Sequence, residues 1–175
     1  MLKRIFILVI VLIALLLAYA TTRPVTFRVE RSATIQAPPD KVFATIDDFH
    51  NWSAWSPWAK LDPAMKETYS GASSGKGAIY EWEGNNKVGQ GRMEITDSNS
   101  PTSDIIKLDF LKPFEAHNTT VFTLQSSGAG TTVIWTMSGP NTYMGKVMGI
   151  FVNMDKMIGK DFETGLANLK AITEK

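Results

Sequence analysis

Alternating apolar and polar residues mark the first strand of the folded part of the chain. The segment VTFRVERSATIQ, residues 25–36, carries apolar side chains at every second position from Phe27 to Ile35, interrupted only by Arg31. A period of two places successive side chains on opposite faces of a strand. One face of this strand is therefore expected to be buried.

The same alternation recurs between residues 65 and 139 and predicts about six further strands. Turns rich in glycine, asparagine and serine separate the alternating segments, at the spacing typical of hairpins. Gly89 and Gly91 fall within one of these strands and indicate a bulge or a sharp bend. The side chains predicted on the inward, apolar side are Tyr80, Trp82, Met93, Ile95, Phe110, Phe122, Val133, Trp135 and Met137, together with the polar residues Asn118 and Thr120.

A period of three and four residues predicts helices in two places. A short helix over about 39–47 follows the first strand, with proline in its first turn. A second apolar stripe runs from Met144 to Ile172. A single helix over this whole stripe would far exceed the usual mean of about 11–12 residues. Because the stripe contains several glycines, a break or kink is expected near residues 149–154.

The order of these elements predicts the α+β class. A strand, one or two short helices, about six strands and a long helix follow one another, so the long helix is expected on one face of an antiparallel sheet. A curved sheet around that helix leaves room for a cavity. Missing side chains at Gly89, Gly91 and Gly165 either allow facing groups to approach closely or leave part of the cavity open.

The N-terminus has a different character from the rest of the chain. Lys3 and Arg4 precede the run IFILVIVLIALLLAYA, residues 5–20, in which the Tyr19 hydroxyl is the one polar side-chain group. At about 1.5 Å per residue the run spans roughly 24 Å, slightly less than a hydrocarbon core of about 30 Å. The run is longer than the roughly 7–15 apolar residues of a signal peptide, which favours an uncleaved membrane anchor. The alternative is a signal peptide cleaved near Ala20, after the A-x-A pattern of AYA.

These segments predict two parts of the chain: residues 1–22 as anchor or signal peptide, and residues 23–175 as one folded domain. Both interpretations place the basic N-terminus in the cytoplasm and send the domain across the membrane. The expected location is the cytoplasmic membrane, crossed once through residues 5–20, with the domain on the periplasmic or extracellular side. Cleavage would instead give a secreted domain.

Composition removes several kinds of chemistry. The chain contains no cysteine, which excludes disulfides, thiolate catalysis and zinc sites built on cysteine. Two of the 18 basic residues lie in the N-terminal segment, so the remainder carries 16 basic and 17 acidic residues. Without a basic excess or a basic run, no nucleic acid partner is expected. Nothing in the sequence indicates an oligomeric state.

Four segments together resemble a known superfamily. They are RSATIQAPPDKVFATIDDFHNWSAWSPW, YEWEG followed by VGQGRMEI, TTVIWTMSG, and GKDFETGLANLKAITEK. They are similar to the SRPBCC superfamily, which includes the START and Bet v 1-like proteins, and most of all to its bacterial polyketide cyclase/dehydrase-like branch. The resemblance covers about residues 25–174 and implies a helix-grip fold, in which a curved seven-stranded antiparallel sheet encloses the C-terminal helix. It also implies a cavity for a hydrophobic ligand between sheet and helix, and it supplies no universal catalytic motif.

Three tryptophans stand at every third position in the segment NWSAWSPWAK, residues 51–60. Trp52 is expected to pack on the sheet edge or on the long helix, whereas Trp55 and Trp58 are expected to form the rim or wall of the cavity. Ordinary core packing is the alternative for each inward residue. The predicted ligand cavity comprises Trp55, Trp58, Tyr80, Trp82, Met93, Phe110, Asn118, Thr120, Trp135, Met148 and Phe151.

Catalytic and metal-binding residues are not expected. The two histidines, His50 and His117, lack the neighbours of a catalytic triad or a metal site. No cofactor or metal is expected, and the sequence favours a protein that binds a small hydrophobic molecule or a lipid without catalysis. Two alternatives remain: a cyclase or dehydratase acting on a polyketide-like substrate, and a membrane-interface domain whose tryptophan segment lies among lipid headgroups.

Overall fold

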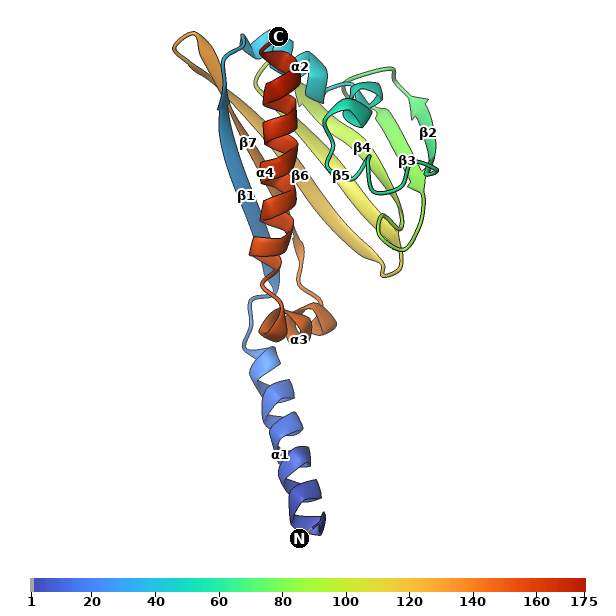
Figure 1. Ribbon diagram of the computed structural model, residues 1–175, viewed down its shortest axis with the longest axis vertical. Coiled ribbons are helices and arrows are strands. Elements are labelled where there is room, and N and C mark those ends of the chain that lie inside the picture. Colours follow the sequence, from blue (N-terminus) through green and yellow to red (C-terminus); the bar gives the residue numbers. More distant parts are fainter. Residues whose placement is uncertain (1) are drawn as a thin grey trace.

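A computed structural model describes residues 2–175, and its elements follow the predicted order (Figure 1). The α+β class is confirmed. In chain order the elements are α1 (Leu2–Thr21), β1 (Thr26–Ile35), α2 (Pro39–Ile46), the 3-10 helix η1 (Phe49–Ala54), β2 (Lys66–Gly71), β3 (Ala78–Glu83), β4 (Gln90–Asn99), β5 (Ser103–Lys112), β6 (Ala116–Ser127), β7 (Gly130–Pro140), α3 (Tyr143–Phe151) and α4 (Met154–Thr173).

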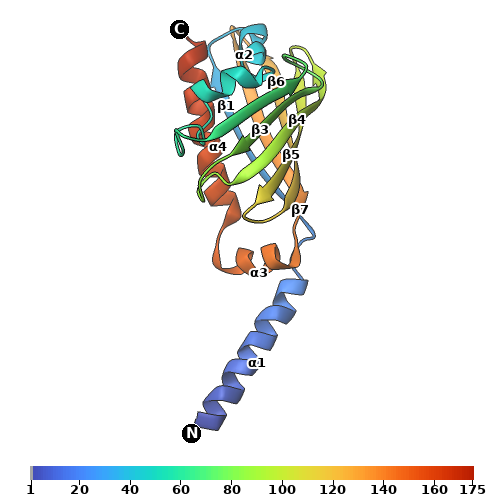
Figure 2. The same cartoon turned by 90° about the vertical axis from the view of Figure 1, so that its right-hand side faces the viewer.

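All seven strands belong to one antiparallel sheet with the order β1-β7-β6-β5-β4-β3-β2. Strands β2 to β7 are neighbours in chain order, and β1 pairs with β7 at the far edge. The sheet curves around α4, which runs along its inner face (Figures 1 and 2). This is the predicted helix-grip arrangement, with α2 and η1 as the predicted short helices.

Burial alternates along the strands as the sequence predicted. On β6, Asn118, Thr120, Phe122 and Leu124 are buried, whereas the residues between them are more exposed. On β7, Val133, Trp135 and Met137 are buried. Phe162 and Leu166 of α4 join them in one hydrophobic core, so the period of two identified the inner face correctly.

Arg31 interrupts the apolar alternation of β1 because it pairs with α4. Its guanidinium lies 3.0 Å from the Asp155 carboxylate and 2.8 Å from that of Glu163. A side chain at Gly159 would occupy the space that the guanidinium fills. Both acidic partners are largely exposed, so these ion pairs fix the position of α4 beside the edge strand more than they add to stability.

The C-terminal apolar stripe is divided into two helices, as predicted. The first, α3, ends at Phe151 and the second, α4, begins at Met154. The Asn153 side chain accepts a hydrogen bond from the Lys156 amide at 2.9 Å and caps the start of α4. Thr142 caps α3 in the same way, accepting from the Gly145 amide at 3.1 Å.

The inward glycines permit close approach rather than leave a void. A Cβ atom at Gly165 would lie 2.7 Å from the Trp135 ring, and one at Gly91 would collide with the Trp82 ring. At Gly89 the backbone has a φ of 66°, and a Cβ there would meet the Lys112 carbonyl. All three positions are therefore occupied by neighbouring groups, and the cavity described below has another origin.

Helix α1 projects away from the domain, below α3 (Figures 1 and 2). Among residues 2–175 it is the one helix long and apolar enough to cross a membrane, and almost all of it is exposed. Near its C-terminal end α1 contacts α3, and the Tyr143 hydroxyl donates a hydrogen bond to the Leu17 carbonyl at 3.1 Å. Helix α1 is thus attached to one particular element of the domain.

A buried carboxyl group lies at the end of the domain opposite α1. Asp104 on β5 is fully buried, and within residues 2–175 neither of its oxygens has a hydrogen-bond partner. Burial raises the pKa of Asp104 to about 7, and the nearby carboxylate of Asp47 adds to the rise. The folded protein therefore holds a proton on this side chain at pH values where the unfolded chain has released it.

We expect Gly165→Ala to lower the free energy of unfolding relative to Gly149→Ala. Both changes gain the same helix propensity, but the new methyl group at position 165 meets the Trp135 ring at 2.7 Å, whereas nothing lies within 4 Å at position 149. Overpacking of this kind costs about 1–3 kcal/mol. Urea unfolding of the two variants measures the difference, and equal stabilities would contradict the close contact.

The burial of Asp104 predicts that stability falls as the pH rises from about 4 to about 7. The pKa of Asp104 is raised in the folded state, so its contribution is complete below the unfolded pKa and is lost as the pH passes the folded pKa. Asp104→Asn removes this slope and is expected to stabilise the protein at pH 8 by up to about 4 kcal/mol. Melting temperatures from pH 4 to 8 test this, with Asp40→Asn, at an exposed position in the first turn of α2, as the control that keeps the slope.

Candidate functional site

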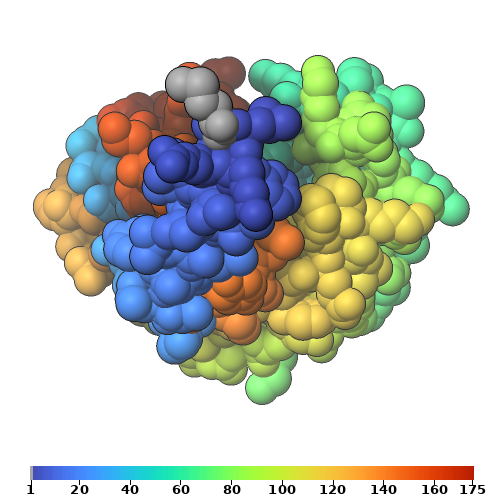
Figure 3. Space-filling view, turned by 90° about the horizontal axis from the view of Figure 1, so that it is seen from below, coloured from blue at the N-terminus to red at the C-terminus, as the bar shows by residue number. Residues whose placement is uncertain are grey.

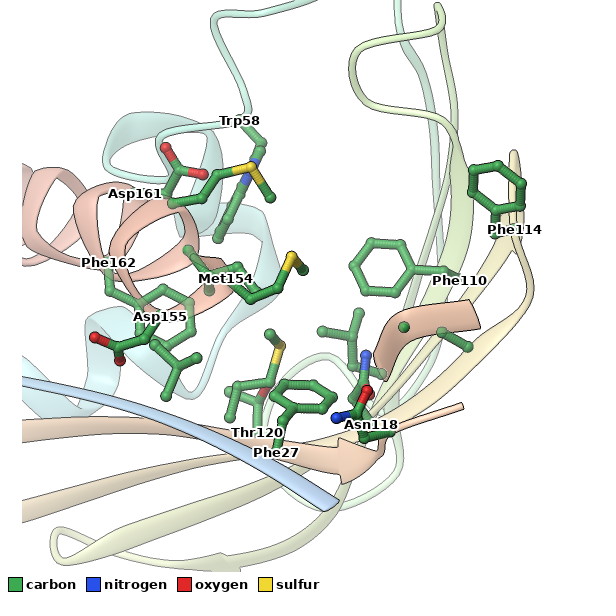
Figure 4. Close-up of a pocket in the computed structure, with 18 of the residues that line it drawn as sticks. Phe27, Trp58, Phe110, Phe114, Asn118, Thr120, Met154, Asp155, Asp161 and Phe162 are labelled. Carbon is green, nitrogen blue, oxygen red and sulfur yellow. The ribbon is translucent and has the colours of Figure 1, made fainter. Parts of the chain in front are cut away.

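A cavity of about 1360 Å³ lies between the inner face of the sheet and the helices α3 and α4. This exceeds the roughly 300–1,000 Å³ of sites for drug-sized ligands, so it has room for a lipid-sized molecule. Figure 4 shows side chains from the sheet, from α4 and from the tryptophan segment converging on it. The cavity is the main candidate for a functional site.

Aromatic rings form much of the wall. Trp82 on β3 stacks on Tyr80 of the same strand and meets Phe110 of β5 edge-on, with ring centroids 5.9 Å and 5.8 Å apart. On the other side of the cavity, Trp58 contacts Trp135 of β7 at 5.9 Å. These strands present the rings inward because the inward positions of neighbouring strands share one face of the sheet.

Ten of the eleven residues predicted for the cavity lie in its wall. They are Trp58, Tyr80, Trp82, Met93, Phe110, Asn118, Thr120, Trp135, Met148 and Phe151. That any of them contacts a ligand stays a prediction. Met148 and Phe151 belong to α3 and are also exposed, so they lie where the cavity opens to its surroundings.

Trp55 does not belong to the cavity wall, and its predicted place there is wrong. It is fully buried behind the wall, with its ring edge-on to Trp135 at 5.6 Å and to Phe122 at 6.1 Å. The 3-10 helix η1 ends at Ala54, so Trp55 and Trp58 do not share a helical turn and their rings have different surroundings. The buried ring of Trp55 therefore supports the wall that Trp58 forms.

Trp52 also differs from its prediction. Its ring packs against Phe122 on β6, near the middle of the sheet rather than at its edge, and its indole N–H donates to the Ile46 carbonyl at 2.8 Å. Trp52 and Trp55 are buried, and their segment lies at the end of the domain opposite α1 (Figure 1). Trp52 and Trp55 are therefore core residues, and the place of Trp58 among lipid headgroups stays a prediction.

Two polar side chains on β6 face the cavity without a protein partner. Asn118 and Thr120 are buried, and within residues 2–175 neither side chain forms a hydrogen bond to the protein. A Cβ at Gly139 on the neighbouring strand would collide with the Asn118 amide oxygen, so glycine there makes room for the amide. Buried polar groups are normally hydrogen-bonded, which leaves these two available to a ligand or to water.

Sequence reasoning missed the acidic residues in the wall, among them Asp161 and Glu67. Asp161 on α4 lies close to Trp58 (Figure 4), and burial raises its pKa. Glu67 on β2 accepts a hydrogen bond from the Tyr80 hydroxyl at 2.9 Å. The sequence positions of both residues could have revealed them. Asp161 follows Ile158 by three residues and so falls on the apolar stripe of the helix. Glu67 is two residues from Tyr69 and so points to the same face of the strand.

The histidines lie outside the cavity wall. His117 bonds Asp109 at 2.7 Å on the outer face of the sheet, and this hydrogen bond raises the pKa of the imidazole. His50 bonds Asp48 at 2.7 Å and stacks on Tyr69. In the part of the chain that the structure describes, no three acidic or histidine side chains are grouped to hold a metal ion.

Solved structures share this fold at low sequence identity. Protein CV1439 from Chromobacterium violaceum matches with a TM-score of 0.60 and 14% identity, over 87% of this chain and 99% of that one. The di-domain ARO/CYC protein BexL from the BE-7585A biosynthetic pathway matches with 0.62 and 15%, over 90% of this chain and 53% of its own. Ara h 8.0201 matches with a TM-score of 0.58 and 12% identity, over 85% of this chain and 97% of that one.

No curated protein matches the sequence. A family model does match, over residues 26–174, which is nearly all of the chain beyond α1. That model is described as polyketide cyclase / dehydrase and lipid transport. Together with the cavity, it identifies residues 26–174 as a ligand-binding or cyclase-type domain. The chain therefore belongs to the polyketide cyclase / dehydrase and lipid transport family.

Proposed function

We propose that the chain is a membrane-anchored binding protein for a neutral amphiphile of lipid size. The observation that carries this proposal is the cavity of about 1360 Å³, walled by aromatic and methionine side chains and containing two polar groups without protein partners. Each 100 Å² of apolar ligand surface buried there contributes about 2.5 kcal/mol before the cost of ordering the ligand. Binding needs no catalytic residue.

The polar groups favour a ligand with an uncharged head. The Asn118 amide supplies both a donor and an acceptor, and the Thr120 hydroxyl can act as either. The wall contains four acidic and four basic side chains, so it has no net charge that would favour an ionic head group. A hydroxyl or an amide on an otherwise apolar molecule matches these groups best.

The N-terminal helix supports attachment to a membrane. The helix α1 has 20 residues, and its apolar part, residues 5–20, spans roughly 24 Å of a hydrocarbon core of about 30 Å. Lys3 and Arg4 at its start favour a cytoplasmic N-terminus, which would hold the domain on the outer side of the cytoplasmic membrane. In the alternative, cleavage near Ala20 releases the domain.

A cyclase or dehydratase is the second candidate, favoured by Asp161. This carboxyl group lies in the cavity wall, and burial raises its pKa above that of a free aspartate; a carboxyl group in reach of a bound substrate can act as a general acid or base. Tyr80 and Asn118 face the same space. A polyketide-like substrate bound there would meet one titratable group and two hydrogen-bonding groups.

The binding proposal predicts that Asn118→Ala weakens an alcohol more than a hydrocarbon. We expect a fluorescent long-chain alcohol to lose about 2- to 10-fold in affinity, the worth of one hydrogen bond. The same fluorescent chain without its hydroxyl should bind unchanged. Quenching of tryptophan fluorescence in the full chain measures both, with Asn86→Ala in an exposed loop as the control. An equal loss for both probes, or no binding of either by the wild-type protein, would contradict the proposal.

The enzyme candidate predicts turnover of an aromatic polyketide mimic that depends on Asp161. Removing a general acid or base typically lowers the rate about 10²- to 10⁴-fold, so Asp161→Asn should abolish most turnover. Product formation is followed by mass spectrometry, with the exposed Asp40→Asn as the control. Absence of turnover in the wild-type protein would reject this candidate and leave the binding proposal in place.

A further inference from the structure

Large apolar side chains are exposed around the open end of the cavity. Met144, Met148 and Phe151 lie on α3, and Phe114 lies on the hairpin that joins β5 and β6. Phe114 is 75% exposed, Phe151 71% and Met144 64%, and all four also line the cavity. We call these four residues the rim. The surface of a soluble protein rarely has so many exposed apolar side chains in one patch unless the patch binds a partner.

The rim adjoins the helix that is long and apolar enough to cross a membrane. Helix α3 contacts α1, and the Tyr143 hydroxyl donates to the Leu17 carbonyl in the last turns of α1. Asn141 bonds the segment that follows α1, through its amide N–H to the Val25 carbonyl at 2.8 Å and through its side chain to the Pro24 carbonyl at 3.2 Å. Figure 3, which looks at this end of the molecule, shows α1 in blue directly against α3 in orange.

These contacts determine the depth of α3 once α1 is in a bilayer. Leu17 lies within the apolar part of α1, four residues before its end at Thr21. Tyr143 therefore sits level with the last turns of α1, at the membrane–water interface where tyrosine is favoured. The one charged residue of α3 is Lys146, and Arg23 follows α1 in the same region, so basic groups are placed to meet lipid phosphates.

We propose that the rim lies in the interface of the bilayer that holds α1, so that the cavity opens toward the lipid. This inference rests on the proposed membrane-anchored binding function and adds the route of the ligand. An amphiphile would pass between bilayer and cavity behind α3 without crossing water. The flexible side chains of Met144 and Met148 suit a surface that must adapt to changing lipid contacts.

The absence of cysteine from the chain makes the test direct, since one introduced thiol carries the only label. Phe151→Cys, Phe114→Cys, Leu12→Cys and Ser74→Cys are prepared in the full chain, labelled with an environment-sensitive fluorophore and placed in phospholipid nanodiscs. Leu12 reports on α1, and Ser74 lies in the exposed loop between β2 and β3, beside α2. Quenchers are lipids spin-labelled at the headgroup or along the acyl chain.

We expect at least 50% quenching at position 151 by headgroup and shallow acyl labels, in line with interfacial depth. Position 114, across the mouth, should respond to headgroup labels alone. Position 12 should respond to deep labels, and position 74 to none. Quenching at 12 without quenching at 151 would overturn the docking of the rim while α1 stays anchored.

Three further outcomes also overturn the inference. A label at 151 that shifts to shorter wavelength but is not quenched by lipid would show that protein, such as a second copy of the chain, covers the rim. Quenching at 151 without quenching at 114 would show that α3 touches lipid while the mouth faces water. If neither position 12 nor position 151 is quenched, the membrane anchorage in the proposed function fails together with the inference.

Discussion

The contact between Trp135 and Phe162 holds the long helix against the sheet. Their rings lie parallel, with centroids 4.1 Å apart, and join β7 to α4. Gly165 allows the helix backbone to come this close to the Trp135 ring, and Trp55 and Phe122 pack around that ring from the other sides. An aromatic pair of this kind adds about 0.5–1.5 kcal/mol beyond its buried area. Its larger effect is on position, because it sets where α4 lies on the sheet.

The position of α4 creates the cavity. The helix packs mainly along β1, where Arg31 pairs with its acidic side chains. Helix α4 therefore leaves the inner faces of β3, β4 and β5 largely uncovered, and their aromatic and methionine side chains line an open space. Gly89, Gly91 and Gly165 do not enlarge the cavity, because neighbouring groups occupy the space beside each of these glycines. An off-centre helix, rather than missing side chains, keeps the cavity open.

The two ends of the cavity differ: two polar side chains lie on its sheet side, and the exposed apolar rim surrounds its opening. Asn118 and Thr120 lie on its sheet side, whereas α3 and the hairpin carrying Phe114 surround its open end beside α1. An amphiphile needs both features, because its apolar part requires a dry wall and its polar part requires a partner. The family description joins cyclase, dehydrase and lipid transport, and the cavity offers the common requirement of all three, an enclosed space for a largely apolar molecule.

The pattern of residues by itself determined the class, the seven strands, their inward faces and the break between α3 and α4, because periods of two and of three to four depend only on backbone geometry. Seven of the cavity residues followed from those faces. Tertiary structure decided which inward residues are core and which are wall. Trp55 and Trp58 are three residues apart in one segment, yet Trp55 is buried against Trp135 and Trp58 lines the cavity. The alternation along a strand identifies the face to which a side chain points. Whether that face borders the core or a cavity depends on where a distant helix packs. For the same reason, only the folded chain shows that α3 and its rim lie against the end of α1.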